Sequence, residues 1–74
     1  MPAKKPSRPW RLLYTTNGSV TDTKHRSRPE ADRAAAVEIA RIADGSSRVV
    51  RIRIEKWDTE AGSWQDAATA YPTT

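Results

Sequence analysis

The residues of this 74-residue chain that could do chemistry are arginines, lysines and tryptophans, and no catalytic or metal-binding set accompanies them. With no cysteine and one histidine, His25, the chain cannot form a thiolate site or complete a histidine-based zinc site. A general-base role for His25 would need a nucleophile and an oxyanion site, and the sequence indicates neither. We expect a protein that is not an enzyme, with no cofactor, metal or small-molecule substrate.

Basic residues are concentrated at the start of the chain. Residues 1–11 carry the whole net charge of +4, because the remaining 63 residues balance nine basic against nine acidic side chains. Three prolines in the same stretch favour an extended, solvated arm over residues 1–9. Such an arm could bind phosphates with strong salt dependence, or simply keep a small protein soluble. The arm contains Lys4, Lys5 and Arg8, and Arg11 follows it.

A second basic cluster, Lys24, Arg26 and Arg28, lies just before a predicted helix. Unpaired N–H groups and the helix dipole favour anions at such a position, so a phosphate site is one interpretation. The alternative is an exposed loop whose cations neutralise Glu30 and Asp32.

A hairpin and a helix are predicted in the first part of the chain. Residues 10–16 and 19–25 are strand-like and flank Asn17-Gly18, the strongest short hairpin signal. This turn places an exposed His25 opposite Trp10. Ser27 and Glu30 form a capping box, and residues 31–44 are rich in helix formers up to Gly45. One helix face collects Ala31, Ala35, Ala36, Ile39, Ile42 and Ala43, with Glu38 away from it.

A second hairpin is predicted in the last third of the chain. Residues 48–57 alternate, so that Val50, Ile52 and Ile54 share one face and arginines the other. Residues 58–63 form a loop, and residues 64–71 form a weaker strand ended by proline. Placing Trp57 opposite Trp64 sets Ile54 against Ala67 and Val50 against Tyr71.

These elements predict an α+β fold, ββαββ, with a four-stranded antiparallel sheet of order 2-1-3-4 and one helix on one face. Residues 10–71 form the single domain, residues 1–9 the arm and residues 72–74 a tail. The core consists of Leu12, Tyr14, Val50, Ile52, Ile54 and the helix face.

The sheet face without a helix, which we call the open face, interleaves tryptophan with cations. Three interpretations stand: a platform for single-stranded nucleic acid, a tryptophan pair that only stabilises its hairpin, or half of a homodimer. Its expected members are Arg11, Leu13, Val20, Lys24, Val49, Arg51, Arg53, Trp57 and Trp64.

The segment Trp-Arg-Leu-Leu-Tyr-Thr-Thr-Asn-Gly-Ser-Val, the alanine-rich helix and Val-Arg-Ile-Arg-Ile-Glu-Lys-Trp-Asp resemble small uncharacterised proteins of actinobacteria and their phages. The resemblance covers residues 10–64. It implies an origin, in an actinobacterium, a phage or a mobile element, and no activity or site residue.

The expected function is binding of DNA or RNA through the arm, Lys24, Arg26, Arg28 and the Arg51/Arg53 side of the open face, mostly by phosphate contacts. The neutral body of the chain is the argument against this function. The alternative is a protein-interaction module, either a homodimer or a small inhibitor or adaptor, anchored by Trp57, Trp64 and Arg51. No apolar run is long enough for a membrane span and no signal peptide is recognisable, so a cytoplasmic protein is expected.

Overall fold

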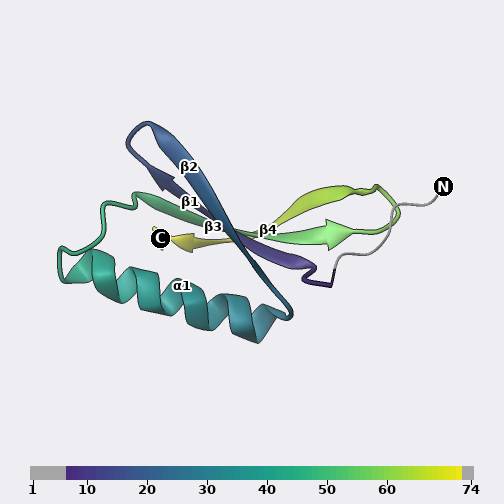
Figure 1. Ribbon diagram of the computed structural model, residues 1–74, viewed down its shortest axis with the longest axis horizontal. Coiled ribbons are helices and arrows are strands. Elements are labelled where there is room, and N and C mark those ends of the chain that lie inside the picture. The colour runs from purple at the N-terminus through teal and green to yellow at the C-terminus, as the bar shows by residue number, and fades with distance from the viewer. Residues whose placement is uncertain (1–6, 73–74) are drawn as a thin grey trace.

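The computed structural model describes residues 7–72 and contains four strands and one helix (Figure 1). The elements are β1 (Trp10–Thr16), β2 (Ser19–His25), α1 (Arg28–Ala43), β3 (Arg51–Asp58) and β4 (Ser63–Tyr71). All neighbouring strands are antiparallel, and the sheet order is β2-β1-β3-β4. The predicted ββαββ, α+β fold is therefore confirmed.

The first hairpin has the register that Asn17-Gly18 predicts. Thr16 lies opposite Ser19 and Trp10 opposite His25, and Gly18 takes a φ of 100°, which a residue with a side chain rarely adopts. The expected exposure of His25 is wrong: this residue is only 9% exposed. The start of α1 covers it, and its Nε2 lies 2.8 Å from Thr23 Oγ1 and its Nδ1 3.8 Å from Glu30 Oε1.

Helix α1 begins with the predicted cap. Ser27 has an extended backbone, and its Oγ accepts a hydrogen bond from the Glu30 N–H at 3.3 Å. The Glu30 carboxylate reaches back to the N–H of Arg26 at 3.2 Å, one residue before the position that a capping box uses. The end of β2 is thereby tied to the first turn of α1.

Substitution of Ser27 tests how much the cap contributes to stability. Ser27→Ala should lower the free energy of unfolding by about 1 kcal/mol, because the Glu30 N–H loses its acceptor. Ser27→Asp, which keeps an acceptor oxygen, should stay close to the native value. Urea denaturation followed by circular dichroism measures both variants. Equal losses in the two variants would contradict a capping role for Ser27.

The core lies between α1 and one face of the sheet and is small. Its buried members are Leu12, Ala31, Ala35, Ile52 and Ile54. The contact face of α1 is rotated relative to the prediction, because Ala36 and Ala43 are exposed whereas Ala34 packs against the core. Glu38, expected on the outer face, is half-buried.

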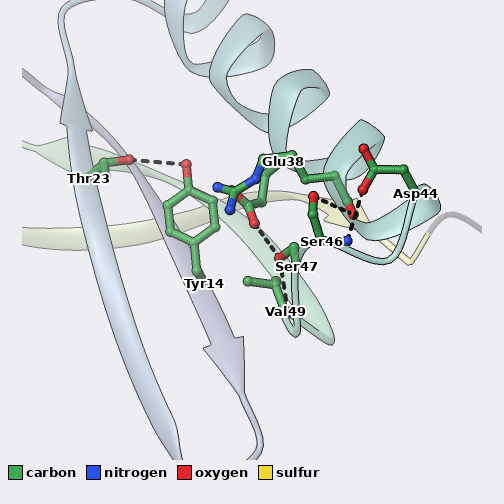
Figure 2. Close-up of polar contacts among 8 residues, drawn as sticks. Tyr14, Thr23, Glu38, Asp44, Ser46, Ser47 and Val49 are labelled. Atoms are coloured by element: carbon green, nitrogen blue, oxygen red, sulfur yellow. Dashed lines mark hydrogen bonds and ion pairs between the residues drawn. The ribbon is translucent and has the colours of Figure 1, made fainter.

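The end of α1 is closed by side-chain hydrogen bonds (Figure 2). Ser47 Oγ donates to Glu38 Oε2 and accepts from the Val49 N–H at 3.2 Å, so Glu38 anchors the segment that leads into β3. The Ser46 hydroxyl and N–H lower the pKa of the Asp44 carboxyl. In the same view the Thr23 hydroxyl lies 3.3 Å from the Tyr14 hydroxyl, across β1 and β2.

The prediction that Val50 belongs to the core is wrong. Strand β3 begins at Arg51 rather than Arg48, so the alternation does not extend to residues 48–50. Val49 packs against the core in place of Val50, which is 56% exposed. Val49 therefore does not belong to the open face.

The second hairpin pairs Trp57 with Trp64 as predicted, and its register then shifts twice. Ile54 lies opposite Ala68 and Ile52 opposite Tyr71, so that β4 carries an extra residue at Ala67 and another at Ala70. Helix α1 packs on β1, β2 and β4, and the tip of the β3–β4 hairpin extends past its N-terminal end (Figure 1). One face of the sheet and this tip are left without a helix.

Candidate functional site

Trp57 and Trp64 form an aromatic pair on the open face. Their ring centroids are 5.4 Å apart at an interplanar angle of 76°, an edge-to-face arrangement. The Trp57 Nε1–H is buried and has no acceptor among residues 7–72. The predicted pairing of Trp57 with Trp64 is confirmed, whereas the predicted pairings of Ile54 with Ala67 and of Val50 with Tyr71 are wrong, because the two extra residues of β4 shift the register. The tryptophan pair contributes to the hairpin as well as to the surface.

Arg11 joins this pair from the neighbouring strands. Its Nε donates to Glu55 Oε1 at 2.6 Å, and its guanidinium carbon lies 4.6 Å from the Trp64 ring centroid. Arg11 is opposite Glu55 in the β1–β3 register, which explains the contact. Since the two side chains are only 24% and 13% exposed, Arg11 is committed to this cluster.

Two other cations of the open face are also paired with carboxylates. Arg53 lies 2.8 Å from Asp66, whose hydrogen bond raises the pKa of the guanidinium, and Lys24 lies 3.5 Å from Asp22. Arg51 has no ion pair within the described chain. Three of the four cations on the open face are therefore already paired with its three carboxylates, and Arg51 is the one without an ion pair in residues 7–72.

Arg51 and the tryptophans are not brought together. Arg51 begins β3 and lies opposite Thr15, whereas Trp57 is near the other end of the same strand. They are six positions apart along the strand, about 20 Å. Arg11 takes the place beside the tryptophans that was expected for Arg51.

A groove of about 700 Å³ lies at the end of the sheet, between the start of α1 and the tip of the β3–β4 hairpin. The Trp57 N–H donates to the Pro9 carbonyl at 2.7 Å, which holds the start of β1 against β3. We call this groove the basic groove. Its lining residues are Pro9, Trp10, Arg26, Ser27, Arg28, Lys56, Trp57, Asp58, Thr59, Glu60 and Gln65.

Two of the three cations of the basic groove lie against Trp10. The Lys56 ammonium lies 5.4 Å and the Arg28 guanidinium 5.7 Å from the Trp10 ring centroid, within cation–π range. Arg28 also pairs with Asp32 at 3.0 Å. In residues 7–72, no carboxylate forms an ion pair with Arg26 or Lys56. Two cations of the groove are thus available to an anion.

The acidic side chains of the groove come from the hairpin turn. Asp58 Oδ1 accepts hydrogen bonds from the N–H groups of Glu60 and Ala61, at 3.0 and 3.2 Å. This carboxylate stabilises the turn and is partly satisfied by it. Glu60 is exposed and follows it in the turn.

The cations predicted to bind nucleic acid are divided among several places. Arg26 and Arg28 line the basic groove, and exposed Arg8 directly precedes its Pro9. Arg11, Lys24, Arg51 and Arg53 are on the open face, and Lys4 and Lys5 lie outside the described residues.

Lys56 and Trp10 are the groove residues that sequence reasoning missed. They lie opposite each other in the β1–β3 register, on the face that α1 covers farther along the sheet. The alternation of β3 assigns Lys56 to the side of Ile52 and Ile54, where a charged residue is unexpected. A charged residue on the otherwise apolar side of β3 was the sequence signal that α1 does not cover this end of the face.

In the part of the chain that the structure describes, no three acidic or histidine side chains gather as a metal site requires. No helix there is long and apolar enough to cross a membrane. Comparison with known proteins gave no match to a family model, to a curated protein or to a solved structure.

Proposed function

We propose that this chain is a small non-enzymatic binding protein that contacts the phosphate backbone of DNA or RNA at the basic groove. The observation that carries the proposal is the pair of cations, Arg26 and Lys56, that lack a carboxylate partner in residues 7–72 and meet at one groove. The cytoplasm is the compartment we propose for it.

Three features support phosphate binding at this place. The dipole of α1 favours an anion at its N-terminal end, beside Ser27. Cation–π contacts with Trp10 hold Lys56 and Arg28 near the groove before a ligand arrives. The chain from Arg8 back to Lys4 begins at the same groove, so the arm can add phosphate contacts along a strand.

Contacts of this kind give affinity with little sequence preference. Base edges would have to be read by side chains that enter a helical groove or by rings on which bases stack. The Trp10 ring is the aromatic ring of the groove with two cations in contact with it, so these cations compete with a base for stacking on it. We therefore propose backbone binding, with the arm and groove cations as its main source of affinity.

The test is fluorescence anisotropy with labelled mixed-sequence oligonucleotides of DNA and RNA, single- and double-stranded, over a series of salt concentrations. The native chain should bind in low salt and weaken steeply as salt rises. Arg26→Gln with Lys56→Gln should weaken binding about tenfold and reduce the slope of log K against log salt by about 1.4 to 1.8, because two phosphate contacts are lost.

Arg33→Gln with Arg48→Gln is the matched control. Both arginines are exposed and lie outside the groove, and the double substitution removes the same charge. Net charge alone would make the two double variants equal, which would overturn the groove as the site. No binding by the native chain in low salt would overturn nucleic-acid binding altogether.

A second candidate function, contact with another protein through the open face, is favoured by the cluster of Arg11, Trp57 and Trp64. Its charges are already paired and its rings are fixed, as in the centre of many protein interfaces. Arg51 would contribute only at the far end of such an interface. A protein partner whose binding is lost with Trp64→Ala and kept with Arg26→Gln would support this function over the first.

A further inference from the structure

The two edges of the sheet differ. The β4 edge is interrupted by the extra residues Ala67 and Ala70 and is followed by Pro72, devices that hinder pairing with another strand. Strand β2, from Ser19 to His25, pairs with β1 in one continuous register, and Ser19–Lys24 are exposed. It is the regular edge of the sheet.

The direction of the backbone groups on β2 follows from its neighbours. Thr15 and Pro9 direct their carbonyls to the β3 side of β1, where the N–H groups of Val50, just before β3, and of Trp57 donate to them. Successive residues of a strand face opposite neighbours, so Trp10, Leu12, Tyr14 and Thr16 face β2. On β2, Thr21 and Thr23 then bond to β1, while Val20, Asp22 and Lys24 direct their N–H and C=O groups outward.

We propose that this edge pairs with β2 of a second copy of the chain, antiparallel, with a twofold axis at Thr23. Asp22 of each copy then lies opposite Lys24 of the other, and the two sheets join into one. The proposal does not depend on nucleic-acid binding.

Several registers set the outward-facing residues of the two copies opposite each other, and the axis at Thr23 gives the most favourable charge pairs among them. An axis at Asp22 would set the two Asp22 carboxylates side by side, which is unfavourable. An axis at Thr21 would leave Lys24 opposite the turn residue Gly18. The axis at Thr23 places two opposite-charge pairs across the contact and Val20 opposite Arg26.

The side chains can form these pairs with little rearrangement. Asp22 and Lys24 are 3.5 Å apart within one copy and are 38% and 50% exposed, on the open face. In the dimer they would form a set of four alternating charges. Thr23 residues at the axis form a pair without backbone hydrogen bonds, the closer of the two kinds of antiparallel pair.

Cysteine cross-linking reads the register directly, because the chain has no cysteine of its own. Thr23→Cys should form a disulfide-linked dimer under mild oxidation, since the two Cα atoms would lie within disulfide distance. Thr21→Cys, exposed on the same face of the same strand, is the control. Its two copies would be about 14 Å apart, too far for a disulfide.

Charge variants test the same contact without a disulfide. In sedimentation velocity, Asp22→Lys and Lys24→Asp should each dimerise about tenfold more weakly than the native chain, because both pairs become repulsive. An equimolar mixture of the two variants should recover native dimerisation, since every contact across the edge is again between opposite charges.

Circular dichroism checks that these exposed substitutions leave the fold intact. A native chain that remains monomeric at high micromolar concentration, or cross-links faster through Thr21→Cys than through Thr23→Cys, overturns the proposal. A dimer lost with Trp64→Ala and unaffected by the charge variants also overturns it, and assigns the contact to the open face.

Discussion

Ile52→Ala should lower the free energy of unfolding by about 2 to 5 kcal/mol, the largest effect expected in this chain. Ile52 has no exposed surface and packs with Leu12 between the sheet and α1. Removing its outer carbons loses burial and leaves a cavity that a core of five buried side chains cannot easily refill. The free energy of unfolding of a domain of this size is only about 5 kcal/mol.

Val50→Ala is the matched control for Ile52→Ala. Val50 is 56% exposed, two residues away and outside β3, so its substitution should change stability by less than about 0.5 kcal/mol. Urea denaturation followed by tryptophan fluorescence measures both variants. If Val50→Ala lowers the free energy of unfolding as much as Ile52→Ala does, then Val50 is buried as the alternation predicts, and the five-residue core described above is wrong.

Glu55→Gln should cost about 1.5 to 3 kcal/mol, the second-largest effect. Glu55 accepts the hydrogen bond of the Arg11 guanidinium at 2.6 Å in a half-buried place. The substitution keeps the shape of the side chain and leaves the Arg11 charge without a counterion in contact with Trp64. Because that charge cannot be fully hydrated there, part of the stability of the sheet is lost.

Asp66→Asn is the comparison for Glu55→Gln. Its partner Arg53 is more exposed, and water can replace the lost carboxylate. Asp66→Asn should therefore destabilise the chain clearly less than Glu55→Gln. Equal effects in thermal unfolding would show that the Arg11–Glu55 pair is solvated like an ordinary surface pair, which would contradict its partial burial.

The fold could be predicted because its signals are local. Asn17-Gly18 determines the first hairpin, Ser27 and Gly45 bound the helix, and the alternation around Ile52 identifies a strand with one buried face. A helix between two hairpins then leaves few ways to assemble an antiparallel sheet.

The errors concern features that depend on how one element packs or pairs with the next, which the pattern within a single element does not show. His25 is covered only because the capped start of α1 lies over the end of β2. Glu38 is half-buried because Ser47 binds it from the following loop. The extra residues in β4 are defined by its pairing with β3, which the pattern of neither strand shows alone.

The candidate site was predicted in part for the same reason. The pre-helix position of Arg26 and Arg28 was sufficient to place both cations at the start of α1, where they line the basic groove. Lys56 and Trp10 join them only because the β3–β4 hairpin extends past α1 (Figure 1). The engagement of Arg11 and Arg53 by carboxylates depends on pairing across the sheet, which a list of basic residues does not contain.

Titration of the isotope-labelled chain with a short mixed-sequence oligonucleotide in low salt, followed by amide and indole N–H resonances, tests nucleic-acid binding at the basic groove most directly. Trp10 and Trp64 give one indole signal each, from the groove and from the open face. We expect the largest shifts at the Trp10 indole and at the amides of Arg26, Arg28 and Lys56, reversed by added salt. Shifts confined to Trp64 and the amides of Arg51 and Arg53, or no shifts at all, would contradict binding at the groove.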